Sequence, residues 1–235
     1  MKLAALQAVL SERFPSAVPQ PVIAPPEMVS SGVTAVDALT GGLPRGSLIE
    51  ICGARCSGRT SLLLAMLAAA GSRGEVCALV DGRDSFDPQS AHAAGVDLTR
   101  LLWVRCKNIE QAFRCAEWLL LGGGFGLVAL DLGEIPPQAV RRVPLNVWFR
   151  FRRAVEHTPV IFTVLEQHPH AATCASLVLE LCADNPRWVV ANSEQTLPHA
   201  SLFAGKQVHT EVVRARFGAV VKPPSRKEEF PATRH

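Results

Sequence analysis

The chain has 235 residues and a formal net charge of +3, with 48% hydrophobic and 19% charged residues. This composition excludes a long disordered chain, and the length allows one well-buried domain with short appendages. The small net charge gives no reason to expect nucleic-acid binding over the whole surface, although a local basic patch could still serve that purpose.

Targeting and redox signals indicate a cytoplasmic protein. No apolar run is long enough for a membrane span, and the start of the chain lacks the cleavage site of a signal peptide. The seven cysteines include no CxxC pair, and several fall inside apolar runs. We therefore expect buried, reduced thiols and no structural metal.

The two ends of the chain differ in composition from its middle. Apolar residues at helical spacing predict a short amphipathic helix over 2–14, and a proline-rich stretch after it predicts an extended linker. We assign residues 1–27 to this helix and linker, 28–220 to a folded core, and 221–235 to a flexible charged tail.

Within the core, short apolar runs alternate with helical patterns, which indicates an α/β fold. Strands that are apolar throughout and separated by helices predict a mostly parallel central sheet flanked by helices. After residue 175 no long helical pattern follows, so we expect an antiparallel C-terminal extension of the sheet. The predicted strands are 48–52, 76–81, 101–104, 127–131 and 160–164, and the predicted helices are about 60–71, 88–95, 109–121 and 138–156.

The segment Gly53–Ser61, GARCSGRTS, has the spacing of the GxxxxGK[ST] phosphate loop, with Arg59 in the lysine position. It follows an apolar strand and opens a helix, so backbone N–H groups and the helix dipole would face an anion. The alternative is an ordinary strand-to-helix turn with two glycines. The predicted phosphate-binding residues are Gly53, Ser57, Gly58, Arg59, Thr60 and Ser61.

A metal-binding pair is predicted beside this loop. Asp131 ends the apolar run LVALD, at the carboxyl end of a strand, where ligands of open α/β sheets bind. Thr60 and Asp131 are therefore the candidate Mg²⁺ ligands. Arginine is longer and planar, so Arg59 is not a conservative replacement for lysine at a site of fixed geometry.

Four segments between Val29 and about Pro137 resemble the bacterial recombinase RecA: SSGVTAVDALTGGLPRGSLIEICG, SGRTSLLLAMLAAA, VCALVDGRDSFDP and AGVDLTRLL. They occur in the order and spacing of that family, which implies a RecA-like P-loop core. Within this group the chain is most similar to ImuA-type proteins, RecA-like proteins associated with damage-induced mutagenesis.

The resemblance also implies losses at the nucleotide site. Arg83 stands where the family has its catalytic glutamate, and Ser90 stands where an aromatic side chain stacks on adenine. A cation cannot polarise the attacking water as a carboxylate does, and Asp84 points elsewhere on an extended segment. Together with Arg59, these changes predict no competent catalytic residue, weak or absent binding of ATP and Mg²⁺, and little or no ATPase activity.

Two further groups of arginines are candidate contact residues. Arg214 and Arg216 match family lysines that reach a neighbouring subunit's nucleotide, which makes them candidates for an anion at an interface; alternatively they are solvated charges on an edge strand. A second group interleaves with aromatic residues and could meet DNA or a partner, although helical spacing favours burial of most of the aromatics. The second group is Arg141, Arg142, Arg150, Arg152 and Arg153.

These features together predict an accessory or adaptor protein of damage-induced error-prone DNA repair, acting in the SOS response and translesion synthesis. The expected partners are error-prone polymerase components, RecA itself and single-stranded DNA, and not a membrane. The segments that replace the family's DNA-binding loops leave direct DNA binding open. Two alternatives stay open: a DNA-dependent ATPase of the recombinase type, and a nucleotide-sensing regulator such as an SOS cell-division inhibitor.

Overall fold

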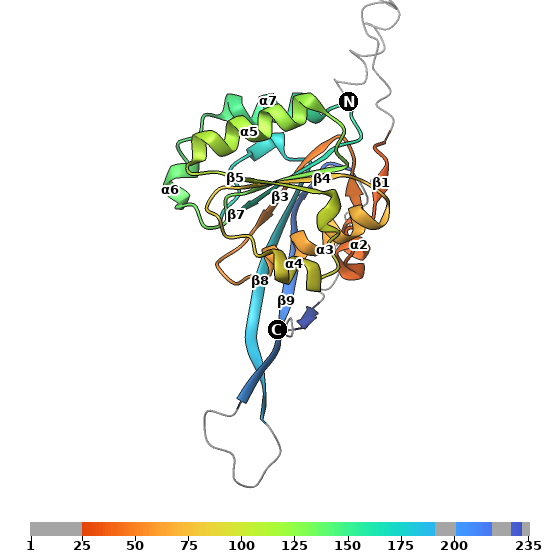
Figure 1. Ribbon diagram of the computed structural model, residues 1–235, viewed down its shortest axis with the longest axis vertical. Coiled ribbons are helices and arrows are strands. Elements are labelled where there is room, and N and C mark those ends of the chain that lie inside the picture. The colour runs from red at the N-terminus through yellow and green to blue at the C-terminus, as the bar shows by residue number, and fades with distance from the viewer. Residues whose placement is uncertain (1–24, 191–200, 218–226, 232–235) are drawn as a thin grey trace, which may run out of the picture.

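The computed structural model describes residues 25–190, 201–217 and 227–231 (Figure 1). The predicted helix over 2–14 and most of the linker and tail fall outside these ranges. Inside the predicted tail, β10 (Lys227–Pro231) pairs antiparallel with β9 (Ser201–Ala215). None of the helices in the described ranges is long and apolar enough to cross a membrane.

An eight-stranded sheet in the order β10-β9-β8-β3-β7-β6-β4-β5 forms the centre of the molecule. The strands from β8 to β5 run parallel, and β9 and β10 add the antiparallel extension. This confirms the predicted α/β fold class. The strands are β3 (Ser47–Cys52), β4 (Cys77–Asp81), β5 (Leu101–Arg105), β6 (Leu127–Asp131), β7 (Ile161–Glu166) and β8 (Leu177–Val190), and β1 (Met28–Val29) pairs with β2 (Leu43–Pro44) in a separate small sheet.

Helices cover both faces of the sheet, as Figure 1 shows. Every residue of β3 is buried, and alternate side chains enter different cores: Leu48 packs in one cluster and Ile49 in the other. This explains why the strands are apolar throughout rather than alternating. On the Ile49 side lie α2 (Thr34–Thr40), α3 (Arg59–Ser72) and α4 (Pro88–Ala93); on the Leu48 side lie α5 (Ile109–Gly122), α6 (Pro137–Val140) and α7 (Leu145–Val155), and two 3-10 turns span Leu98–Arg100 and Ala172–Cys174.

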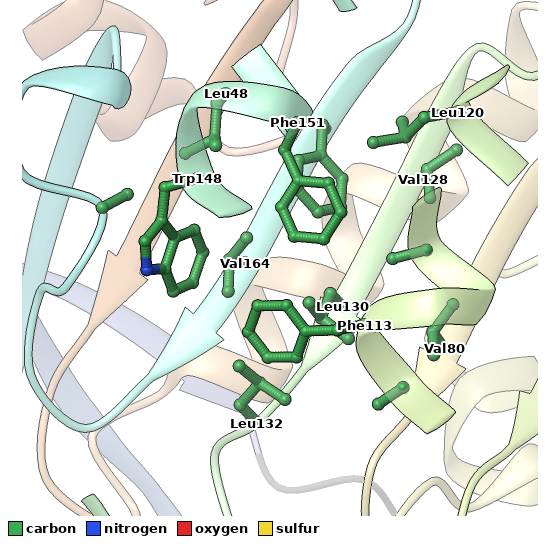
Figure 2. Packing of buried hydrophobic residues seen from close by; sticks show 14 of the residues in the cluster. Leu48, Val80, Phe113, Leu120, Val128, Leu130, Leu132, Trp148, Phe151 and Val164 are labelled. Carbon is green, nitrogen blue, oxygen red and sulfur yellow. The ribbon is translucent and has the colours of Figure 1, made fainter. Parts of the chain in front are cut away.

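The core beneath α5 and α7 is built around aromatic side chains (Figure 2). Phe151 stacks on Phe113 with ring centroids 5.5 Å apart and meets Phe162 edge-on at 5.0 Å. Trp148 packs edge-on against Phe113 at 5.4 Å. Such pairs contribute beyond the area they bury, so α7 is fastened to the sheet mainly through these rings.

The single helix predicted over 138–156 is wrong, because the chain forms two helices, α6 and α7, on either side of Pro144. Proline offers no N–H and disfavours helical geometry in the residue before it, so the helix cannot run through this position. The predicted burial of most of the aromatics is confirmed, since Trp148 and Phe151 are each 1% exposed, whereas Phe149 is 41% exposed.

We predict that Phe151→Ala lowers the free energy of unfolding by about 3–5 kcal/mol, because it removes the ring that contacts three others and leaves a cavity. Urea denaturation followed by circular dichroism measures the loss. Phe149→Ala is the matched control on the same helix: Phe149 is 41% exposed, so its loss should cost less than about 1 kcal/mol. Equal effects of the two substitutions would contradict this account of the core.

Candidate phosphate-binding site

The P-loop, Gly53–Ser61, connects β3 to α3 through a tight turn. Gly53, Cys56 and Gly58 have φ angles of 152°, 60° and 101°. The β8–β9 hairpin passes close to this turn: a Cβ added at Gly53 would lie 2.3 Å from the carbonyl oxygen of Leu181. Glycine is required at Gly53 because no side chain fits between the loop and the hairpin.

Two buried polar atoms of the P-loop have no hydrogen-bond partner in the described structure: Oγ of Ser57 and Nη1 of Arg59. These residues are 3% and 6% exposed. Buried polar groups are normally paired, so both atoms fit a site that an anion completes. Thr60 is exposed and Ser61 half-buried on the first turn of α3, where free N–H groups and the helix dipole favour negative charge. The loop thus fits a phosphate group.

The Arg59 side chain reaches the end of β6. A Cβ added at Gly133 would lie 3.0 Å from Nη1 of Arg59 and 3.0 Å from Oδ1 of Asp131. The guanidinium and the carboxylate therefore flank the same backbone position. The N–H of Gly133 donates to Oδ1 of Asp131 at 2.8 Å, and its carbonyl accepts from Nε2 of Gln167 at 3.0 Å. The structure thus brings Arg59 and Asp131 together, as the phosphate-loop hypothesis requires.

The pKa of Asp131 is raised to about 6, chiefly by burial and in smaller part by the charge of Asp81. The N–H of Gly133 and the charge of Arg59 act in the opposite direction by favouring the carboxylate. A carboxyl group with a pKa this close to neutral binds metal ions less readily than an ordinary aspartate, because protons compete. Thr60, the second predicted Mg²⁺ ligand, is exposed at the adjacent helix start.

The segment after β4 is organised by Asp81. This buried carboxylate accepts the N–H groups of Arg83, Ser85 and Phe86 at 3.1, 3.1 and 2.9 Å. Arg83 itself is exposed. Asp84 has a φ of 59° and forms a two-pronged ion pair with Arg105. The carboxylates of Asp81 and Asp84 therefore already accept hydrogen bonds from other residues of the chain.

The same segment leads into α4 at Asp87, whose carboxylate accepts the N–H groups of Gln89 and Ser90 at 3.2 and 3.0 Å. The hydroxyl of Ser90 also donates to Asp87. Ser90, at the position where the resemblance places an adenine-stacking ring, thus helps to begin a helix.

Sequence reasoning missed an ion pair across the mouth of the P-loop. Nη2 of Arg55 lies 2.8 Å from Oε2 of Glu134, and both side chains are largely exposed. Exposed pairs of this kind are weak and easily exchanged. Arg55 belongs to the phosphate-loop motif and Glu134 follows β6, and nothing in the sequence indicated that the two would meet.

A buried acidic cluster beside the site was also missed. Oε1 of Glu50 accepts the N–H groups of His170 and Ala171 at 2.7 and 2.6 Å, and Oε2 of Glu166 lies 2.5 Å from Nδ1 of His170. Burial raises the pKa of Glu50, and burial together with Glu50 raises that of Glu166 well above its usual range, while burial lowers that of His170. A glutamate inside the apolar run LIEIC was the available signal, since charge is rarely buried unpaired.

Arg214 and Arg216 do not meet the P-loop of their own chain. Arg214, on β9, lies opposite Val178 near the start of β8. Its guanidinium donates to the carbonyl of Ala172. The guanidinium of Arg216 lies 5.6 Å from the centre of the Phe217 ring. Their role as anion contacts at an interface stays a prediction.

The arginine-rich segment lies over α5, away from the P-loop face. Arg150 forms an ion pair with Glu117 of α5 at 3.4 Å, and Arg152 forms one with Glu156, just after α7, at 2.9 Å. Arg141, Arg142 and Arg153 are exposed. These arginines are thus available as a basic surface, and DNA or partner contact there stays a prediction.

Comparison with known proteins identifies the first half of the chain. A family model described as the RecA N-terminal domain matches residues 21–139. Protein RecA of Acinetobacter baumannii is 37% identical over 116 residues, and that of Chlorobaculum tepidum is 40% identical over 116 residues. Protein RecA of Streptomyces venezuelae is 38% identical over 118 residues.

These matches cover 48%, 48% and 49% of this chain but only 33%, 34% and 31% of the respective relatives. The chain thus corresponds to about a third of their length. The family match includes the P-loop and Asp131 and ends at residue 139, before α7.

We predict that ionisation of Asp131 destabilises the folded state progressively as pH rises from about 4 to about 6. Its folded pKa of about 6 lies above its unfolded value of 3.8, so the folded state keeps its proton longer and is penalised once the group ionises. Asp131→Asn should therefore gain stability relative to the parent over this interval, with no further change above it. Thermal unfolding at several pH values measures the difference.

Asp84→Asn is the contrasting variant. The hydrogen bond from Arg105 lowers the pKa of Asp84, so this pair stabilises the fold above the unfolded pKa and loses its effect as pH falls. Asp84→Asn should therefore lose stability relative to the parent at neutral pH and not in acid. If both variants changed with pH in the same direction, the assigned environment of Asp131 would be incorrect.

Proposed function

Because the chain belongs to the RecA N-terminal domain family, we propose that it is a RecA-like accessory protein of damage-induced, error-prone DNA repair. In this role it binds error-prone polymerase components, and a nucleotide at its P-loop is turned over slowly or not at all. The family membership supports a link to DNA repair, and the resemblance to ImuA-type proteins supports translesion synthesis as the pathway.

The observation that carries the proposal is the absence of an uncommitted carboxylate in the described segment after β4. Asp81 lies under its own loop and accepts three backbone N–H groups, and Asp84 is held by Arg105. Arg83 occupies the position between them. Water activation needs an acceptor that faces the phosphate, and this segment offers a cation instead.

The geometry of the P-loop is better suited to binding a nucleotide than to hydrolysing it. Its backbone, Ser57 and Arg59 present donors to an anion, whereas phosphoryl transfer also requires precise alignment of the terminal phosphate. An accessory protein needs surfaces, and the exposed Arg141, Arg142 and Arg153 on the opposite face of the sheet supply a basic one.

We predict phosphate release close to the uncatalysed background, with and without single-stranded DNA. The Acinetobacter baumannii relative, Protein RecA, assayed in parallel, is the positive control. In a bacterium lacking this chain, damage-induced mutation should be restored equally by the parent and by Asp131→Asn, because the role does not depend on turnover. The two measurements are a phosphate-release assay and a count of mutants after ultraviolet irradiation.

Release at the rate of the control would favour the DNA-dependent ATPase instead, and Glu134→Gln would then show whether the Arg55 partner supplies the missing carboxylate. Mutation that does not depend on the chain would contradict the repair role. Co-elution with polymerase components that requires added ATP would favour the nucleotide-sensing regulator.

A further inference from the structure

We propose that the guanidinium of Arg59 takes the place of a divalent cation, so that the P-loop holds a nucleoside polyphosphate without Mg²⁺. This inference rests on the proposed function in one respect, namely that the nucleotide site is kept for binding. It adds which chemical form of the ligand the site accepts.

The first support is the position of the charge. The residue at the start of α3 turns its side chain onto the end of β6, and Arg59 Nη1 and Asp131 Oδ1 both lie 3.0 Å from the place of a Cβ at Gly133. A metal ion held by Asp131 would have to share this space with a buried guanidinium. Like charges repel strongly where water is excluded, so the residues present do not fit a divalent cation there.

The second support is the reach of the Arg59 charge. Arg59 lies at the same edge of the sheet as Glu166 and Asp131, which end the neighbouring strands β7 and β6, so its positive charge stands where two buried carboxyl groups gather. A cation bound at the carboxyl edge of this sheet would perform the same electrostatic task. In this chain the guanidinium of Arg59 already supplies that positive charge.

The third support comes from the unpaired donors. Nη1 of Arg59 and the hydroxyl of Ser57 are buried within the P-loop and have no partner among the described residues. A guanidinium offers several N–H groups in a plane and binds phosphate oxygens in pairs, which an ammonium group cannot do. Arg59 is therefore placed to neutralise the charge of a bound phosphate, and Ser57 to orient it.

Calorimetric titration of the full chain with ATP, and separately with inorganic tripolyphosphate, tests the inference in buffers containing either Mg²⁺ or EDTA. For the parent, we expect affinities in the two buffers to agree within about threefold. Arg59→Lys should restore dependence on the metal and bind at least about tenfold more weakly in EDTA, because lysine is a shorter point charge and leaves space beside Asp131. Tripolyphosphate shows whether the phosphates alone suffice.

Arg55→Lys is the matched control, since it makes the same chemical change in the same loop at a residue that is largely exposed and paired with Glu134. Like the parent, this variant should bind with the same affinity in Mg²⁺ and in EDTA. A loss of about tenfold or more by the parent in EDTA would overturn the inference, and this comparison needs no variant to fold. Absence of binding by either probe would also overturn it and would leave the repair role to be judged by the mutation assay.

Discussion

The structure depends on how three neighbouring parallel strands end. β7, β6 and β4 finish at Glu166, Asp131 and Asp81, so parallel pairing places three carboxyl groups along one edge of a largely buried sheet. Each is accommodated differently. Asp81 accepts three backbone N–H groups from the segment that follows it, Glu166 pairs with a histidine and has a raised pKa, and Asp131 lies beside a buried guanidinium. Buried carboxyl groups need compensation of this kind, and the hydrogen bonds of Asp81 and Glu166 hold the segments that follow β4 and β7.

The P-loop follows from the same constraint. Its arginine faces the acidic edge and not the solvent, which accounts for the burial of a long charged side chain at the start of α3. A lysine in this position would carry its charge on a shorter and more mobile chain. The substitution therefore changes two features at once: it removes the compact charge that belongs to a conventional phosphate loop, and it supplies the acidic edge with a permanent cation. A loop of this kind is better suited to holding an anion in one position than to aligning it for transfer.

The second face of the sheet carries a separate layer of helices. α5 and α7 are fastened by aromatic rings to strands whose other side carries α3, so the basic surface of α7 and the phosphate loop share one rigid sheet without touching. The family match ends before α7, which places the arginine-rich segment in the part of the chain where its similarity to the matched relatives stops. A protein whose role depends on partners would be expected to carry its distinguishing surface in such a region.

The fold class could be predicted from the sequence, because strands buried on both faces are mostly apolar and helices show their own spacing. The strand before Gly53–Ser61 and the helix that this segment opens could also be predicted, because apolar runs flank the loop on both sides. The direction of the Arg59 side chain, the pairing of Asp84 with Arg105 and the buried site shared by Glu50, Glu166 and His170 could not be predicted in this way. These contacts join residues far apart in the chain, and their geometry depends on strand order and register, which local patterns do not encode. The break at Pro144 differs, because it could have been predicted from the sequence. Proline ends a helix, but the apolar residues around it keep a helical spacing, and this spacing led to the prediction of a single helix.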